Sequence, residues 1–175
     1  MLFDEIIDEM LDIMPINPEN IPDIPLYMDQ VTTFIDDKLK ALKRDEKDKL
    51  LTKTMINNYT KDGLLFPPVK KKYSKTHIAL LFMIYYLKEI LPISDVKEIV
   101  SEISKTEKIM EYFENFVQIQ ASELQLFAQE MKNDADLADS EMLILKLTVR
   151  MNLYKQLIEK VIDNNLMLRQ SQEKS

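Results

Sequence analysis

The residues that could do chemistry gather in one stretch of this chain, residues 51–78. Asparagine side chains can pair with an adenine edge, and lysine ammonium groups can bind guanine or phosphate. Threonine and tyrosine hydroxyls can donate hydrogen bonds to phosphate oxygens, and such contacts set the register of a protein on DNA. The candidate DNA-contacting residues are Lys53, Thr54, Asn57, Asn58, Tyr59, Lys61, Lys70, Lys71, Lys72 and Tyr73.

The three consecutive lysines at 70–72 are the strongest of these candidates, because adjacent ammonium groups repel one another unless an anion lies near. The polar residues between 53 and 61 have an ordinary alternative interpretation as solvent-facing helix residues. Tyr73 could likewise pack at the return of the lysine loop instead of touching phosphate. His77 lies one turn into a strongly apolar segment, so we interpret it as a structural histidine.

The neighbouring residues predict the elements that position these side chains. Thr52 is a good N-cap, and Leu51, Met55 and Tyr59 share one face of the helix that would follow. Gly63 is expected to end that helix, because glycine adopts the left-handed C′ conformation easily. Two prolines, the lysine loop and a tyrosine then lead into the next helix. A short helix, a turn and a basic loop are how winged helix-turn-helix proteins meet DNA.

The same stretch resembles the start of the mercury-resistance-regulator-like (MerR-like) proteins. The similarity lies in the order of Tyr59, Gly63-Leu64-Leu65, Pro67 or Pro68, the lysines at 70–72 and Tyr73, and it continues weakly through 93–99. Asn57 stands where that family has a phosphate-clamping arginine, and Asn58 stands where it has a first tyrosine. The resemblance implies a winged helix-turn-helix fold and DNA binding by a bacterial transcription regulator.

A second resemblance is closer. Residues 21–100 are similar to an uncharacterised bacterial family, domain-of-unknown-function family eighteen thirty-six, which is itself thought to be MerR-like. This resemblance implies a fold and little biochemistry.

Composition favours an all-α protein without enzymatic chemistry. The 175 residues include one glycine, and sheets with their hairpins need more glycine turns than that. Cysteine is absent and His77 is the only histidine, so neither a thiolate nor a histidine metal cluster is expected. No nucleophile–base pair and no phosphate-binding glycine loop occurs. We therefore expect no catalytic residues, no metal and no cofactor.

The net charge of −7 hides a strong asymmetry. Residues 38–77 hold twelve basic and four acidic side chains, a net of +8, and the other residues together carry −15. Such a local basic segment is typical of an electrostatic footprint for an anionic partner, although a solvated charged face gives the same pattern. The acidic N-terminus is unlike a signal peptide, and the longest apolar run, 78–87, is too short to span a bilayer. A cytoplasmic protein without a membrane segment is expected.

Three regions follow from the pattern along the chain. Residues 1–20 form an amphipathic arm (helix 2–14) and part of a proline-rich connector, with docking on the protein's own body favoured over a swapped arm. Residues 21–103 form the helix-turn-helix domain, with helices at 29–42, 52–62, 75–91 and 94–103. The charged linker 43–48 makes its turn longer than usual. Residues 104–170 form a helical hairpin.

The hairpin is predicted from two apolar seams with alternating spacings of three and four. The first comprises Met110, Phe113, Val117, Gln120, Leu124, Phe127 and Met131, and the second comprises Ile144, Leu147, Met151, Tyr154, Ile158, Val161, Asn165 and Leu168. A polar break at 133–136 would join them into an antiparallel pair. Further apolar residues outside the seams favour a homodimer, and packing within one chain is the alternative.

The sequence thus predicts an all-α protein with a MerR-like winged helix-turn-helix domain followed by a long antiparallel helical hairpin. The predicted function is sequence-specific binding of double-stranded DNA by a dimeric bacterial transcription regulator. The alternative is a helical protein–protein interaction module that keeps the fold without reading DNA. A small-molecule effector is compatible with either.

Overall fold

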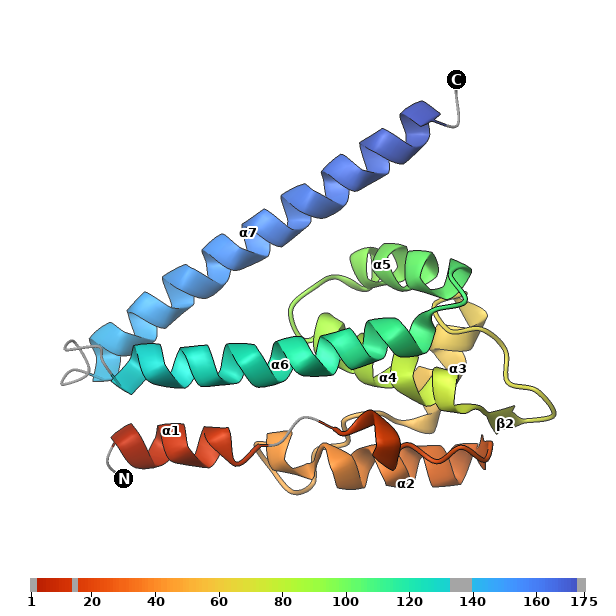
Figure 1. Ribbon diagram of the computed structural model, residues 1–175, viewed down its shortest axis with the longest axis horizontal. Coiled ribbons are helices and arrows are strands. Elements are labelled where there is room, and N and C mark those ends of the chain that lie inside the picture. Colours follow the sequence, from red (N-terminus) through yellow and green to blue (C-terminus); the bar gives the residue numbers. More distant parts are fainter. Residues whose placement is uncertain (1–2, 14–15, 133–139, 173–175) are drawn as a thin grey trace.

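The computed structural model describes residues 3–13, 16–132 and 140–172, and this part of the chain is mostly helical, as predicted. Within it lie seven α-helices, two short strands and two turns of 3₁₀ helix (Figure 1). The elements are α1 (Phe3–Leu11), η1 (Pro18–Asn20), β1 (Leu26–Tyr27), α2 (Met28–Lys38), η2 (Lys40–Leu42), α3 (Lys53–Lys61), β2 (Lys72–Tyr73), α4 (Lys75–Lys88), α5 (Ile93–Lys105), α6 (Ile109–Lys132) and α7 (Ser140–Gln172).

Helix α4 is the centre of the core. Every residue from 77 to 85 is buried, so this helix is covered on all sides, as its nearly continuous apolar sequence predicts. The ring of Phe82 lies 6.3 Å from that of Phe34 on α2 and 6.1 Å from that of Phe113 on α6. Helix α5 packs on the same core through Val96 and Val100. Helix α3 contributes Ile56 and Tyr59 to this same core.

Helix α3 begins and ends where the sequence predicts. The Thr52 hydroxyl accepts a hydrogen bond from the Met55 backbone N–H at 3.2 Å. Gly63 has a φ of +71°, and the Leu64 N–H donates to the Tyr59 carbonyl at 2.8 Å while the Gly63 N–H donates to the Thr60 carbonyl at 3.3 Å. These bonds form a Schellman motif, which satisfies carbonyls at the helix end. A glycine is needed at this position because of its positive φ.

Helix α2 is shorter than the predicted 29–42. It ends at Lys38, Leu39 is the capping residue, and Leu42 lies on the 3₁₀ turn that follows. The Lys43 ammonium then binds the Asp36 carboxylate at 2.8 Å, which draws the chain back onto α2. Residues 43–52 run without regular structure to α3, so the connection is longer than a tight helix-turn-helix turn, as expected.

The two strands form a small antiparallel sheet at one end of the molecule. Leu26 pairs with Tyr73 and Tyr27 with Lys72, and Val69 forms a further bridge to Lys72. This sheet joins the proline-rich connector to the segment between α3 and α4, two parts that are distant in sequence. No helix in the described part is both long and apolar enough to cross a bilayer.

Helix α1 docks on its own chain. Ile7 is buried against Ala128 and Met131 near the end of α6, and the Lys132 ammonium binds the Asp8 carboxylate at 2.6 Å. Figure 1 shows α1 lying alongside that end of α6. Within the single chain the arm thus lies on its own body, and the choice between this arrangement and a swapped arm stays a prediction. The helix ends at Leu11, earlier than the predicted 14, and residues 2 and 14 lie outside the described residues.

The two predicted seams of the hairpin do not pair within this chain. The α6 seam packs against α4 and α1 instead, with Phe113 and Met131 fully buried there. Most of the predicted α7 seam is solvent-exposed, for example Met151 at 63% and Tyr154 at 66%. Figure 1 shows α6 and α7 diverging from the end where they approach each other. The predicted joining segment, 133–136, lies outside the described residues.

Helix α7 contacts its own chain through a different face. Leu143 and Leu147 lie near the end of α6, and the Arg150 guanidinium binds the Glu130 carboxylate. Further along, Ile162 is buried in the main core, and the Arg169 guanidinium binds Glu102 of α5 at 3.1 Å. Leu147 belongs to the predicted seam. The other contacting residues lie one position before a seam residue at the start of α7 and one position after it at the far end, which is about a quarter of a helical turn to either side.

Candidate nucleic-acid interface

The lysine loop is a two-residue turn. The Lys72 N–H donates to the Val69 carbonyl at 2.9 Å, and the Val69 N–H donates to the Lys72 carbonyl at 3.1 Å. Between them, Lys70 and Lys71 have φ angles of 50° and 63°. Two positive φ values in a row are typical of a type I′ turn, which favours Asn-Gly. Two lysines are therefore held in a conformation that costs a side-chain-bearing residue about 1 kcal/mol or more.

His77 anchors both ends of this loop, which we call the wing (residues 66–73). Its ring lies 3.9 Å from the Phe66 ring and 5.5 Å from the Tyr73 ring. His77 Nδ1 accepts a hydrogen bond from the Ser74 backbone N–H at 3.0 Å. Burial lowers the pKa of His77, and hydrogen bonding to the backbone of Pro67 and Phe66 acts in the opposite direction. The neutral ring therefore serves as a packing group under the wing, as the sequence interpretation holds.

Two of the predicted site residues belong to the core. Tyr59 is 7% exposed, and its pKa is raised by burial and by the nearby Glu89 carboxylate. Tyr73 is 4% exposed, and burial raises its pKa as well. Their rings pack in the core beneath α3 and the wing. The predicted DNA contact concerns the hydroxyl groups of these two tyrosines, and it stays a prediction.

The other candidates on α3 share its outer face. Ile56 and Tyr59 form the buried face of the helix, so its polar residues point away from the core. The exposed candidates are Lys53, Thr54, Asn57, Asn58 and Lys61. This face carries the hydrogen-bonding groups that base edges and phosphates need.

The lysines of the site differ in their surroundings. The Lys53 ammonium forms an ion pair with Asp29 at the start of α2. The Lys72 ammonium lies 5.0 Å from the centre of the Tyr27 ring, which orients it by a cation–π contact. Lys61, Lys70 and Lys71 form no ion pair with any residue in the described ranges. These three are the cations most open to an external anion.

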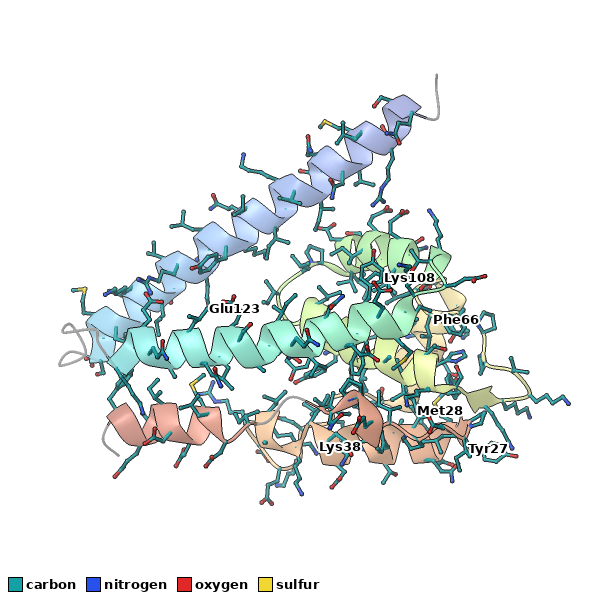
Figure 2. The ribbon with its side chains drawn as sticks, viewed as in Figure 1. Tyr27, Met28, Lys38, Phe66, Lys108 and Glu123 are labelled. Carbon is teal, nitrogen blue, oxygen red and sulfur yellow. The ribbon has the colours of Figure 1, made fainter. Side chains whose placement is uncertain are left out.

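Helix α3 and the wing lie at the same end of the molecule. Figure 1 shows the loop after α3 running out to the wing and returning through β2. Figure 2 labels Tyr27 and Phe66 at this end. The fold thus places the two predicted groups of contact residues on one end of the protein.

A polar groove borders this end and carries charges of both signs. It has a volume of about 1060 Å³ and runs between α2, the 43–52 loop and the start of α3. Its acidic lining residues are Asp36, Asp37, Glu46 and Asp48. Sequence reasoning missed these carboxylates and Asp29 as neighbours of α3, because no local spacing relates them to that helix. In the described ranges there is no cluster of three His, Cys, Asp or Glu side chains that could hold a metal ion.

These features define a mostly helical protein with a polar-faced helix and an anchored basic turn at one end. The chain belongs to the family described as Domain of unknown function (DUF1836), whose model matches residues 16–118. The matched region runs from η1 through the first part of α6, so it includes the whole candidate interface. No curated protein and no solved structure matches the chain.

Proposed function

We propose that this protein binds double-stranded DNA, in the manner of MerR-like winged helix-turn-helix regulators, and controls transcription. The observation that supports this most is the wing tip, where Lys70 and Lys71 occupy left-handed conformations. Strained residues persist where the surrounding structure holds them, and they concentrate at functional sites. Here the strain presents two unpaired cations at the end of a rigid turn, a good arrangement for phosphate contact.

Helix α3 supplies the second part of the proposed contact. With the wing on the phosphate backbone of the DNA, the outer face of α3 would enter the major groove. Asn57 or Asn58 would then read a base edge, and Lys61 would bind guanine or phosphate. Asn57 stands where the MerR-like proteins have an arginine that clamps phosphate. The lysines would therefore make the contacts to the DNA phosphates.

The proposal includes a homodimer formed through α7. The α6 seam is already covered by α4 and α1, so the exposed seam of α7 has no partner helix from its own chain in the described part. Exposed apolar surface of this extent in a long helix is typical of an interface. The seam residues above half exposed are Ile144, Met151, Tyr154, Val161 and Leu168. Helix α7 of a second copy, which carries the same seam, would cover these residues. The dimer would then bind two DNA half-sites.

The DNA contact is tested by salt-dependent binding to specific and random duplexes. Replacing Lys70, Lys71 and Lys72 with alanine should weaken binding to all duplexes, and the slope of log K against log salt should flatten by about 0.9 per lost phosphate contact. Asn57→Ala should instead cost about 1–3 kcal/mol on the specific site and leave the slope unchanged. Lys160→Ala, an exposed charge change on α7, is the control and should alter neither quantity.

The dimer is tested by light scattering. Wild-type protein at micromolar concentration should give about twice the chain mass of 20.6 kDa. Met151→Lys with Tyr154→Lys should give the monomer with unchanged helicity, because both side chains are exposed in the single chain. Gln156→Lys, which also adds a positive charge to α7 but lies outside the seam, should stay dimeric. A wild type that is monomeric at every concentration would contradict the dimer.

A specific observation supports a second candidate, binding to a protein partner. Lys53 is already paired with Asp29, and the groove beside α3 mixes four carboxylates with five lysines, so it offers phosphate little net attraction. If the wild type binds no duplex even at low salt, the basic tip must serve an acidic protein surface instead. The first function would then be wrong and this one would replace it.

A further inference from the structure

A second, largely apolar cavity lies where the N-terminal arm meets the body. It has a volume of about 360 Å³ and is walled by α1, η2, α4 and α6. Its apolar lining residues are Met10, Ile13, Leu42, Tyr86, Leu124 and Phe127. Cavities of about 300–1,000 Å³ with mostly apolar walls and a few polar groups are the usual form of small-molecule sites.

The lining contains one buried hydrogen-bond acceptor that is unsatisfied. Gln120 lines the cavity, and its carbonyl oxygen Oε1 is buried without a hydrogen-bond partner among the described residues. Tyr86 is its neighbour in the lining: burial raises the pKa of Tyr86, and a side-chain hydrogen bond with Gln120 acts in the opposite direction. A buried unpaired acceptor is unfavourable, and a ligand that donates a hydrogen bond would relieve it.

The flexibility of Gln120 makes this acceptor available. The terminal torsion of a glutamine side chain has a broad energy minimum, so Oε1 can turn toward a ligand without moving α6. Glu123 is exposed at the rim of the cavity and is labelled on α6 in Figure 2. Its carboxylate would repel an anion at the entrance.

We propose that this cavity binds a small, mostly apolar, uncharged molecule that carries one hydrogen-bond donor for Gln120 Oε1. Aromatic alcohols have this chemistry. The site does not depend on DNA binding, although Leu42 in its wall precedes the loop that leads to α3. A ligand here would contact both the N-terminal arm and Leu42, just before the loop that leads to α3. From this position it could act as an effector of the proposed DNA contact.

The proposal is tested with 2-naphthol and with 2-methylnaphthalene, which is similar in size but lacks the donor. Isothermal titration of the full chain should show 2-naphthol binding about five- to tenfold more tightly, the effect of one hydrogen bond. Gln120→Leu should remove or reverse that preference, and Leu124→Trp, which fills the cavity, should abolish binding of both compounds. Gln118→Leu, the same change at an exposed position of α6, should behave as wild type.

The folding of each variant is checked by circular dichroism, and only variants with wild-type helicity are compared. The site is overturned if neither compound binds the wild type, or if Leu124→Trp binds them as well as the wild type does. The role of Gln120 is overturned if Gln120→Leu keeps the preference for 2-naphthol. No duplex is present in this assay, so its outcome is separate from that of the DNA-binding experiments.

Discussion

Replacing the wing tip by the sequence that its turn favours should stabilise the protein and weaken DNA binding at the same time. Lys70→Asn with Lys71→Gly places asparagine and glycine at the two positions with φ angles of 50° and 63°. Asn-Gly is the preferred pair for a type I′ turn because both residues tolerate the left-handed region. The substitution therefore relieves backbone strain while it removes two charges.

The expected gain follows from the conformations. Each lysine in the left-handed region costs about 1 kcal/mol, so relief at both positions is worth about 2 kcal/mol. Glycine has more conformational entropy in the unfolded chain, and this cancels roughly 0.5–1 kcal/mol of the stabilisation. The net stabilisation should be about 1 kcal/mol, or roughly 2–4 °C in Tm for a chain of this size.

Urea unfolding followed by circular dichroism measures the gain, and the chain has no tryptophan to serve as an alternative probe. The matched control is Lys70→Ala with Lys71→Ala, which removes the same charges and keeps the strain. In DNA binding, both double variants should lose about 1.8 from the salt slope, because each loses two phosphate contacts.

Equal stability of the Asn-Gly and Ala-Ala variants would refute the reasoning about strain. Wild-type salt slopes in both variants would refute the assignment of the lysines to phosphate. The two outcomes are independent, so the backbone strain and the phosphate contacts are tested separately.

Three further predictions concern the frame around the site. Gly63→Ala should destabilise by about 1 kcal/mol in urea, from the φ of +71° alone, because an added Cβ meets only the Lys97 ammonium at 4.0 Å. Burial lowers the pKa of His77 below its ordinary 6.5, so the unfolded chain takes up the proton first. The free energy of unfolding should thus be highest above about pH 6.5 and decrease below it. His77→Phe should remove this pH dependence in urea titrations. Phe82→Ala should cost about 3–5 kcal/mol in the same assay, because Phe82 is fully buried and packs on Phe113.

The sequence by itself determined the local structure of this protein. The Thr52 cap, the Gly63 stop and the apolar run of α4 are decided by interactions between residues a few positions apart, so their spacing is sufficient to predict them. The same holds for the exposure of Asn57 and Lys61, which follows from the helical period once the buried face is known.

Only the tertiary structure decided which faces meet. An apolar seam shows that a helix face is buried, but the hydrophobic effect has no direction and does not select the partner. The α6 seam therefore packs on α4 and α1, and α7 approaches the body with a face next to its predicted seam. Tyr59 and Tyr73 show a similar ambiguity, because a tyrosine can either pack its ring or present its hydroxyl. The Gln120 cavity arises from contacts between segments far apart in the chain, and no local pattern encodes it. The left-handed tip of the wing is a local turn, but Lys-Lys is not the residue pair that signals such a turn.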